Sequence, residues 1–174
     1  MSVSTRLIQL DDVPQLVTLL QANRDFLAPW EPQRTDEFFT VDHQRVAVGQ
    51  TLDRFQAASA VPHVIVEDGD IVGRITLSNI VRGPFQSANL GYWVARAANG
   101  RGVATAAVAG MVRLAFAECA LHRVEAGTLL HNVGSQRVLE RNGFVRFGVA
   151  PRYLQIAGEY QDHALYQRLA DDPQ

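Results

Sequence analysis

The fold of this chain is decided by one stretch, which reads Leu90-Gly-Tyr-Trp-Val-Ala-Arg-Ala-Ala-Asn-Gly-Arg-Gly-Val-Ala-Thr105. Its opening residues are aromatic or branched around one glycine, which is typical of a buried strand. Two more glycines follow where the chain must turn before a helix. Between Gly102 and Ala117 only Thr105 and Arg113 are polar. This run predicts a helix buried against a sheet, because it is shorter than the roughly 20 residues that cross a bilayer.

The glycine loop lies at the expected N-terminus of that helix. Unpaired backbone N–H groups and the helix dipole favour an anion there, and a phosphate or pyrophosphate is the natural ligand. The loop lacks the Gly-Lys-Ser/Thr ending of a P-loop, and Thr105 occupies the third glycine position of Gly-x-Gly-x-x-Gly. Nucleotide hydrolysis and nicotinamide binding are therefore disfavoured. A purely structural strand-to-helix turn remains the alternative.

The composition indicates one ordinary globular domain spanning residues 1–174. The chain is 47% hydrophobic and 20% charged, which allows a sizeable core. Its 16 basic and 18 acidic residues give a net charge of -2, so we expect neither nucleic acid nor an anionic membrane as a partner. The first twenty residues do not resemble a secretory segment. We expect a soluble cytoplasmic protein, either a monomer or a homodimer.

Cysteine and histidine usage argues against a metal site. Cys119 is the only cysteine, which excludes an intramolecular disulfide and a cysteine pair for zinc. His43, His63 and His122 do not have the spacing of metal ligands. We therefore expect no metal cofactor.

Local signals along the chain predict the order β-α-α-β-β-β-α-β-α-β-β, a mixed α/β domain with one central sheet. The strongest hairpin signal is Asp68-Gly69, and a last turn is expected near Ala157-Gly158. The expected strands are 5–10, 61–67, 71–80, 90–94, 122–129, 144–149 and 153–169. The expected helices follow Pro14, run from Thr40 to about Ala60, and span 102–117 and 135–141.

Two motifs resemble the GNAT family of N-acetyltransferases. Asn99-Gly-Arg-Gly-Val-Ala104 is similar to the family's acetyl-CoA pyrophosphate loop, Gln/Arg-x-x-Gly-x-Gly/Ala, and departs from it at Asn99. One strand later, Asn132-Val-Gly-Ser-Gln-Arg-Val-Leu-Glu-Arg-Asn-Gly-Phe144 matches Asn-x-x-Ser-x-x-x-Leu-x-x-x-Gly-Phe at every stated position. The alternative interpretation of the second motif is that it only caps a short helix. This alternative is disfavoured because the two motifs follow each other in the same order as in the family.

The closing residues resemble one subgroup of that family, the ribosomal-protein alanine N-acetyltransferases. Tyr153-Leu-Gln-Ile-Ala-Gly-Glu-Tyr-Gln-Asp-His163 is similar to the subgroup's Tyr-Leu-x-Ile-x-Gly-x-x-x-Asp-His, and Ser78-Asn-Ile-Val-Arg-Gly83 is also close to it. The likeness covers nearly the whole chain. It implies the family's fold, in which the strands beside the long helix diverge and leave a slot for the pantetheine arm of acetyl-CoA.

The resemblance also implies which residues bind acetyl-CoA. A backbone N–H of the strand before the loop binds the thioester carbonyl, the loop binds the pyrophosphate, and the second motif contacts the pantetheine arm. The implied set is Tyr92, Trp93, Val94, Asn99, Gly100, Arg101, Gly102, Val103, Ala104, Thr105, Asn132 and Ser135.

Acyl transfer from a thioester to an amine needs a neutral amine, a stabilised oxyanion and a proton for the leaving thiolate. By resemblance, Ser135 is the acid for the thiolate. The base is open, because a relative places a glutamate near Leu154 and this chain has none there. Glu125 is the catalytic candidate, and the other substitutes are Glu31 and Asp162. Their structural alternatives are a solvated strand end, a loop carboxylate and a partner for His163, respectively.

The acceptor is expected to bind near Trp30, Glu31, Arg152 and Tyr153, although Trp30 beside Pro29 is equally suited to plug the space under the loop. With pKa values of about 7.8 and 10.4, an α-amine is partly neutral at pH 7 whereas a lysine is almost wholly charged. A site without a strong base therefore favours an α-amine, and the subgroup resemblance implies an N-terminal alanine, as of a ribosomal protein. The alternatives are a small amine, another acyl group such as succinyl, or a non-catalytic acyl-CoA-binding module.

Overall fold

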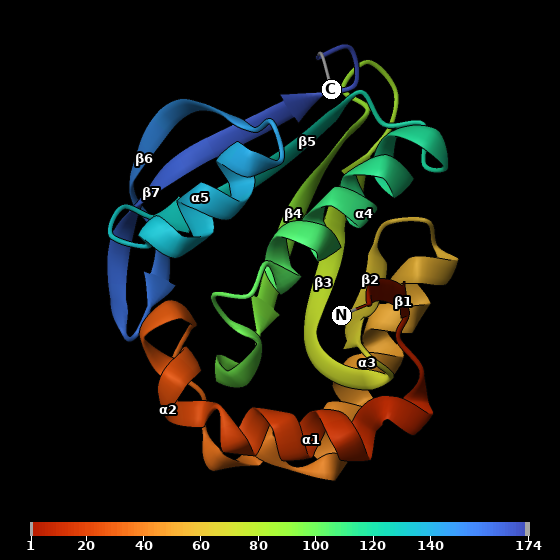
Figure 1. Ribbon diagram of the computed structural model, residues 1–174, viewed down its shortest axis with the longest axis vertical. Coiled ribbons are helices and arrows are strands. Elements are labelled where there is room, and N and C mark those ends of the chain that lie inside the picture. Colours follow the sequence, from red (N-terminus) through yellow and green to blue (C-terminus); the bar gives the residue numbers. More distant parts are fainter. Residues whose placement is uncertain (1, 173–174) are drawn as a thin grey trace.

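The computed structural model describes residues 2–172 and contains one seven-stranded mixed sheet (Figure 1). The strand order is β1-β2-β3-β4-β5-β7-β6, and only the β4–β5 pair is parallel. The strands are β1 (Val3–Leu7), β2 (Val61–Glu67), β3 (Asp70–Val81), β4 (Ser87–Val94), β5 (Arg123–Leu129), β6 (Val145–Ile156) and β7 (Glu159–Leu169).

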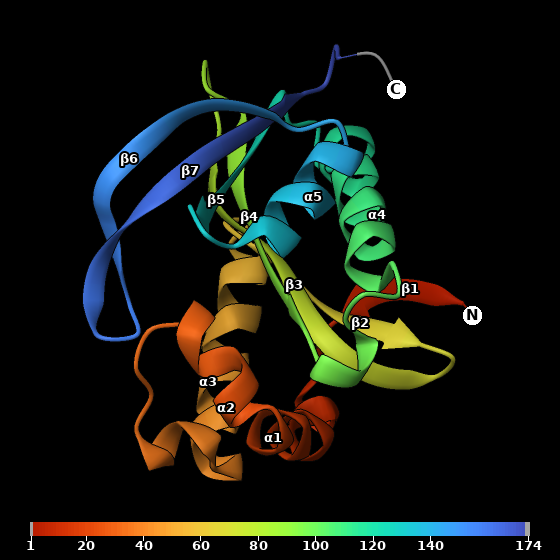
Figure 2. The same ribbon diagram turned by 60° about the vertical axis from the view of Figure 1, so that its left-hand side comes forward.

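Helices cover both faces of the sheet. One face carries α1 (Val13–Ala22), the short α2 (Arg24–Leu27) and α3 (Val41–Gln56), and the other carries α4 (Val103–Ala117) and α5 (Val133–Arg141) (Figure 2). The largest core cluster joins α4 to β2, β3, β4 and β5, and a second cluster joins α1 and α3 to β2 and β3. None of the helices described between residues 2 and 172 is both long and apolar enough to cross a membrane.

The predicted order of elements and the mixed α/β fold are confirmed, with α2 as a short addition. The hairpin predicted at Asp68-Gly69 joins β2 to β3, and both residues have positive φ, +50° and +100°. Such a turn matches the right-handed twist of the flanking strands. The first strand lies two to three residues earlier than predicted, and α3 ends at Gln56 rather than near Ala60.

The last two strands differ more from the prediction, because β6 continues through Pro151 to Ile156. The pairing of β6 with β7 shifts register between Ala150 and Leu154, and Arg152 has a φ of +48°. A proline is tolerated there because β6 is the edge strand and a bulge needs no N–H from it. The turn near Ala157-Gly158 is confirmed.

The two parallel strands β4 and β5 separate soon after they begin to pair. Residue pairing runs only from Ser87 with Arg123 to Asn89 with Glu125. Beyond it, β4 stays paired with β3, and β5 stays paired with β7. Figure 1 shows the two strands diverging beneath α4 and α5. The residues from Leu90 onward therefore present backbone groups to the gap.

Gly73 allows the close approach of β3 and β4, and its replacement tests that register. A Cβ at Gly73 would overlap the carbonyl oxygen of Trp93, whereas a Cβ at Gly148 on β6 would meet nothing within 4 Å. Gly73→Ala should cost about 2 kcal/mol through backbone displacement, which lowers Tm by roughly 4–8 °C. Gly148→Ala should stay within about 2 °C of the parent. Equal melting temperatures for the two variants would contradict the register.

Candidate active site

Three cavities follow one another from the gap between β4 and β5 to the glycine loop. The slot cavity, of about 170 Å³, lies between the diverging strands. The middle cavity, of about 350 Å³, shares Tyr92 and Ser135 with it, and the loop cavity, of about 260 Å³, shares Asn99 and Val138 with the middle one. The slot cavity is lined by Leu27, Trp30, Glu31, Leu90, Gly91, Tyr92, Trp93, Ala126, Gly127, Thr128, Leu129, Asn132, Ser135, Leu139 and His163.

The glycine loop has the backbone conformation that an anion site requires. Gly100 and Gly102 have φ values of +75° and +84°, and Gly102 is the N-cap of α4 without any side-chain cap. Residues other than glycine rarely adopt this left-handed conformation. The first backbone N–H groups of the fifteen-residue α4 are therefore open to a ligand at the positive end of the helix dipole.

The slot cavity holds a pair of hydroxyl groups. The Tyr92 OH lies 2.9 Å from Ser135 Oγ and also donates to the Ser135 carbonyl oxygen at 3.3 Å. Burial raises the pKa of Tyr92 to about 12. The phenol therefore keeps its proton at neutral pH. Sequence reasoning assigned Tyr92 only a backbone role and missed its side chain, whose position depends on the meeting of β4 and α5.

Asn132 and Ser135 lie at the start of α5, as the second motif predicts. The Asn132 side-chain oxygen accepts a hydrogen bond from the Ser135 backbone N–H at 3.1 Å and caps the helix. Asn132 and Ser135 both line the slot and middle cavities, so the cap holds Ser135 at these cavities. Asn132 thus both caps α5 and lines two of the three cavities.

Trp30 and Glu31 occupy different positions in the site. Trp30 lines the slot and middle cavities and packs against His131, with ring centroids 5.6 Å apart. Glu31 lines the slot cavity and also an outer cavity of about 680 Å³ on the α1–α2 side. Its backbone oxygen accepts a hydrogen bond from Ala157 N at 2.9 Å, which ties it to the β6–β7 turn.

Glu31 has one charged neighbour close in sequence, Arg34, and another far away in sequence, Arg74. Burial raises the pKa of the Glu31 carboxyl, against the opposing effect of Arg34 and Arg74. Arg74 on β3 is close enough to Glu31 for the charge of each to affect the pKa of the other, and burial lowers the pKa of Arg74. Sequence reasoning missed Arg74, because an arginine in an alternating strand carries no local sign of its partner.

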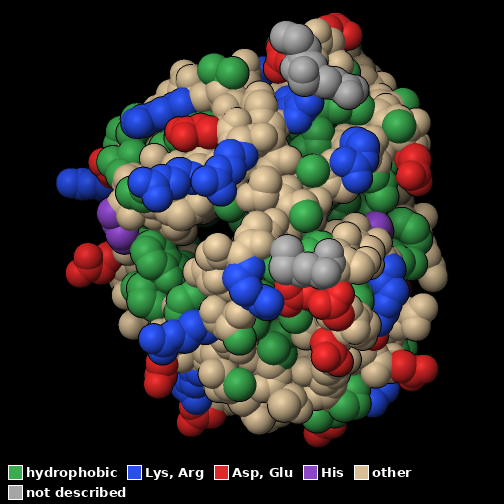
Figure 3. Space-filling view, viewed as in Figure 1, with side chains coloured by type: hydrophobic (Ala, Val, Ile, Leu, Met, Phe, Trp, Pro, Cys, Tyr) green, Lys and Arg blue, Asp and Glu red, His purple; other side chains and the backbone are tan. Residues whose placement is uncertain are grey.

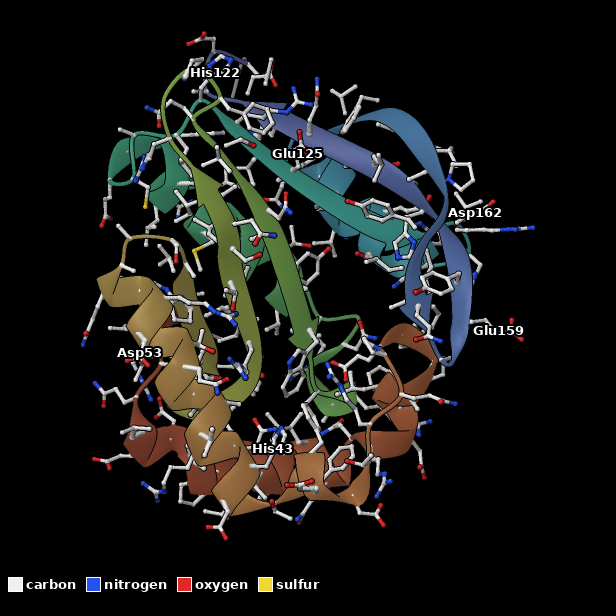
Figure 4. All side chains as sticks on the ribbon, turned by 180° about the vertical axis from the view of Figure 1, so that it is seen from behind. His43, Asp53, His122, Glu125, Glu159 and Asp162 are labelled. Carbon is white, nitrogen blue, oxygen red and sulfur yellow. The ribbon has the colours of Figure 1, made fainter. Side chains whose placement is uncertain are left out.

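Glu125 lies apart from the hydroxyl pair. It forms an ion pair with Arg123 and lines a cavity of about 380 Å³ on the opposite side of the gap, together with Tyr153. Figure 4 shows Glu125 on β5 and Asp162 on the β6–β7 hairpin, well separated from each other. The structure therefore places Glu31, and not Glu125, among the residues that line the slot cavity.

The remaining candidates belong to the β6–β7 hairpin. The Asp162 carboxylate accepts a hydrogen bond from the Arg152 backbone N–H at 2.8 Å, which stabilises the bulge of β6. The Tyr153 ring packs edge-on against His163 at 5.6 Å, and His163 also lines the slot cavity. No three His, Cys, Asp or Glu side chains gather as a metal site among residues 2–172.

The arrangement suits a thioester bound along the three cavities. A helix N-terminus with two left-handed glycines lies at one end, hydroxyl groups lie at the other, and unpaired strand backbone lies between them. The residues that line the loop cavity include Arg137 and Arg141 but no carboxylate. Sequence reasoning missed these two arginines, although they lie inside the second motif.

The comparisons with known proteins agree with this geometry. Residues 4–145 match the model of the acetyltransferase (GNAT) domain. The "Probable N-acetyltransferase YjcK" of Bacillus subtilis is 34% identical over 98% of this chain and 96% of its own length. The ribosomal protein uS5-alanine N-acetyltransferase of Escherichia coli is 31% identical over 92% of this chain and 84% of its own length.

A solved structure extends the likeness to the whole fold. Mycobacterium smegmatis RimJ, described in complex with CoA-disulfide, superimposes with a TM-score of 0.95 at 33% identity, covering 99% of this chain and 84% of that one. With the family model matching most of the chain and the three cavities placed as an acyl-CoA requires, this chain belongs to the GNAT family of acetyl-CoA-dependent N-acetyltransferases.

Proposed function

We propose that this enzyme transfers the acetyl group of acetyl-CoA to the N-terminal α-amine of a protein, with alanine as the terminal residue. One observation carries the proposal: the slot cavity and the outer cavity of about 680 Å³ share Leu27 and Glu31 in their walls. An extended chain end can occupy the outer cavity while its amine enters the slot. The names of the relatives favour a ribosomal protein as the acceptor, and both substrates would then be cytoplasmic.

The cofactor follows the three cavities in this proposal. The backbone N–H groups of the loop from Asn99 to Thr105 bind the pyrophosphate, and the free edge of β4 near Tyr92, Trp93 and Val94 binds the arm and the thioester carbonyl. The divergence of β4 from β5 supports this assignment, because those backbone groups have no partner strand.

Two proton transfers accompany the reaction. The amine nitrogen attacks the thioester carbon, an oxyanion forms and collapses, and the carbon–sulfur bond breaks as the thiolate leaves. The Tyr92–Ser135 pair donates a proton to this thiolate, since its hydroxyl groups are bonded to each other within the slot cavity. The proton lost by the amine goes to Glu31, directly or through one water. Glu31 then releases it to solvent, and solvent returns a proton to the Tyr92–Ser135 pair.

Glu31 is favoured as the base by its position and its environment. It stands where the outer cavity joins the slot cavity, so the incoming ammonium passes it. A raised pKa makes its carboxylate a better proton acceptor than an exposed glutamate. The positive charges of Arg34 and Arg74 oppose the effect of burial on the pKa of Glu31 and favour its anionic form.

A moderate base suits an α-amine better than a lysine. At pH 7, about 1 kcal/mol is needed to deprotonate an α-amine and about 4.6 kcal/mol for a lysine, from 1.36 kcal/mol per pKa unit. A carboxylate is too weak a base to offset most of the free energy needed to deprotonate a lysine. The chemistry of the site therefore agrees with the subgroup resemblance.

Ser135→Ala tests the hydroxyl pair. We expect kcat to fall by about 100-fold, with affinity for acetyl-CoA nearly unchanged. The helix cap survives, because it uses the Ser135 backbone N–H, and the Tyr92 OH keeps the Ser135 carbonyl oxygen as an acceptor. Melting temperature should therefore move little. Tyr92→Phe removes the partner hydroxyl and should lower kcat similarly. Full turnover in the alanine variant rejects the acid role.

Glu31→Gln tests the base against Glu125→Gln. We expect kcat of the Glu31 variant to fall about 100-fold. In the parent enzyme, kcat should rise with pH as Glu31 loses its proton, at a pH above the ordinary glutamate value of 4.5, and this limb should vanish in the variant. His163 and Tyr92 also line the cavity, so the full pH profile must be compared. Loss of turnover in Glu125→Gln alone would assign the base to Glu125 instead.

The acceptor is tested by thiol release with a panel of amines. An Ala-starting peptide without lysine should turn over, whereas the same peptide with a blocked N-terminus and one lysine should not. The enzyme adds no lysine side chain of its own to this assay, because all 16 of its Lys and Arg residues are arginine. Selective turnover of a small amine would refute the protein acceptor. If thiol is released with succinyl-CoA but not with acetyl-CoA, the transferred group is succinyl. If thiol is released with neither donor, the protein is a non-catalytic acyl-CoA-binding module.

A further inference from the structure

The arginine of the glycine loop does not face the anion site. Arg101 Nη2 lies 2.5 Å from Glu67 Oε2, and the Glu67 side chain is only 8% exposed. Glu67 ends β2, next to the hairpin turn. A buried carboxylate needs a cationic partner, and removing that partner is costly. Arg101 therefore neutralises Glu67 and attaches the loop to the sheet, although its sequence position suggests a phosphate ligand.

Positive charge reaches the loop cavity from α5 instead. Arg137 and Arg141 both line this cavity, and their spacing of four residues places them on one side of the helix. Among residues 2–172, neither has a carboxylate within 4.0 Å, and no Asp or Glu lines the cavity. Figure 3 shows Lys/Arg side chains gathered over α5, next to a hollow in the surface.

The helix that carries these arginines is held against the first turn of α4. The Asn142 side-chain amide donates to the Thr105 carbonyl oxygen at 3.2 Å and to the Val138 carbonyl oxygen at 2.8 Å. Arg168 donates to the Asn142 carbonyl oxygen from β7. The stems of Arg137 and Arg141 therefore start from a fixed position beside the loop.

We propose that Arg137 and Arg141 bind the 3′-phosphate of CoA, and that Arg101 anchors the loop without binding phosphate. The loop N–H groups already suit the pyrophosphate. Both arginines line the same cavity and are exposed, so each guanidinium group can hold a phosphate beyond the pyrophosphate with two parallel hydrogen bonds. The proposal rests on acetyl-CoA as the donor and not on the choice of acceptor.

The proposal predicts discrimination between CoA and dephospho-CoA, which differ only in the 3′-phosphate. By isothermal titration, the parent should bind CoA about ten times more tightly or better, as expected for charged hydrogen bonds. The double variant Arg137→Gln/Arg141→Gln should lose most of this preference, because its affinity for CoA falls while its affinity for dephospho-CoA stays the same. The preference should also shrink as salt is raised, because both side chains are exposed.

Matched variants separate this role from general effects of charge. Arg45→Gln removes the same charge from exposed α3 and should leave both affinities unchanged. Arg101→Gln should keep the preference while lowering Tm, because Glu67 loses its partner. The double lysine variant Arg137→Lys/Arg141→Lys should retain part of the preference.

Three results would overturn the proposal: no preference in the folded parent, an unchanged preference in the double glutamine variant, or its loss in Arg101→Gln. Melting curves establish that each variant is folded. Failure of the parent to bind either compound would instead contradict the cofactor assignment. The acceptor proposal is judged separately by the amine panel.

Discussion

The separation of β4 from β5 is the constraint on which the rest of the structure depends. Two parallel strands that pair over three residues and then part leave unpaired backbone groups in the middle of a sheet. The fold tolerates this because each strand has a full partner on its other side, β3 for β4 and β7 for β5. Substrate must then supply the hydrogen bonds that a neighbouring strand would make. The candidate site therefore lies where the hydrogen bonding between β4 and β5 stops, and these two strands position α4 and α5 beside it.

Charge is distributed along the site in a graded way. At the phosphate end, arginines of α5 lie at the surface near a helix N-terminus, where water and salt moderate their fields. Near the outer cavity, burial shifts the pKa of Glu31 and of Arg74 toward the neutral form of each. Between them lie the neutral hydroxyl groups of Tyr92 and Ser135.

The sequence predicts what depends on neighbours in the chain. The turn at Asp68-Gly69, the loop from Asn99 to Ala104 and the cap at Asn132 are all short patterns with a defined backbone geometry, and they place β2, α4 and α5 correctly. The family resemblance adds the divergence of the two strands beside the long helix, which the structure confirms. What the sequence does not show is pairing across long separations. Arg101 and Glu67 are 34 residues apart, and Tyr92 and Ser135 are 43 apart. The environment of Glu31, and hence its pKa, likewise depends on β3, which no local pattern links to it. The continuation of β6 through Pro151 depends on its place at the sheet edge, which is a property of the assembled sheet.

The hydrogen bond from Ala157 N to the Glu31 carbonyl oxygen joins the tip of the β6–β7 hairpin to the segment after α2. Figures 1 and 2 both show the tip of that hairpin descending to α2. This bridge lies in the wall of the outer cavity, which both Glu31 and Ala157 line. Because the accepting carbonyl group belongs to Glu31, one hydrogen bond joins the hairpin turn to the backbone that carries this carboxylate, and a shift of either segment would move the other.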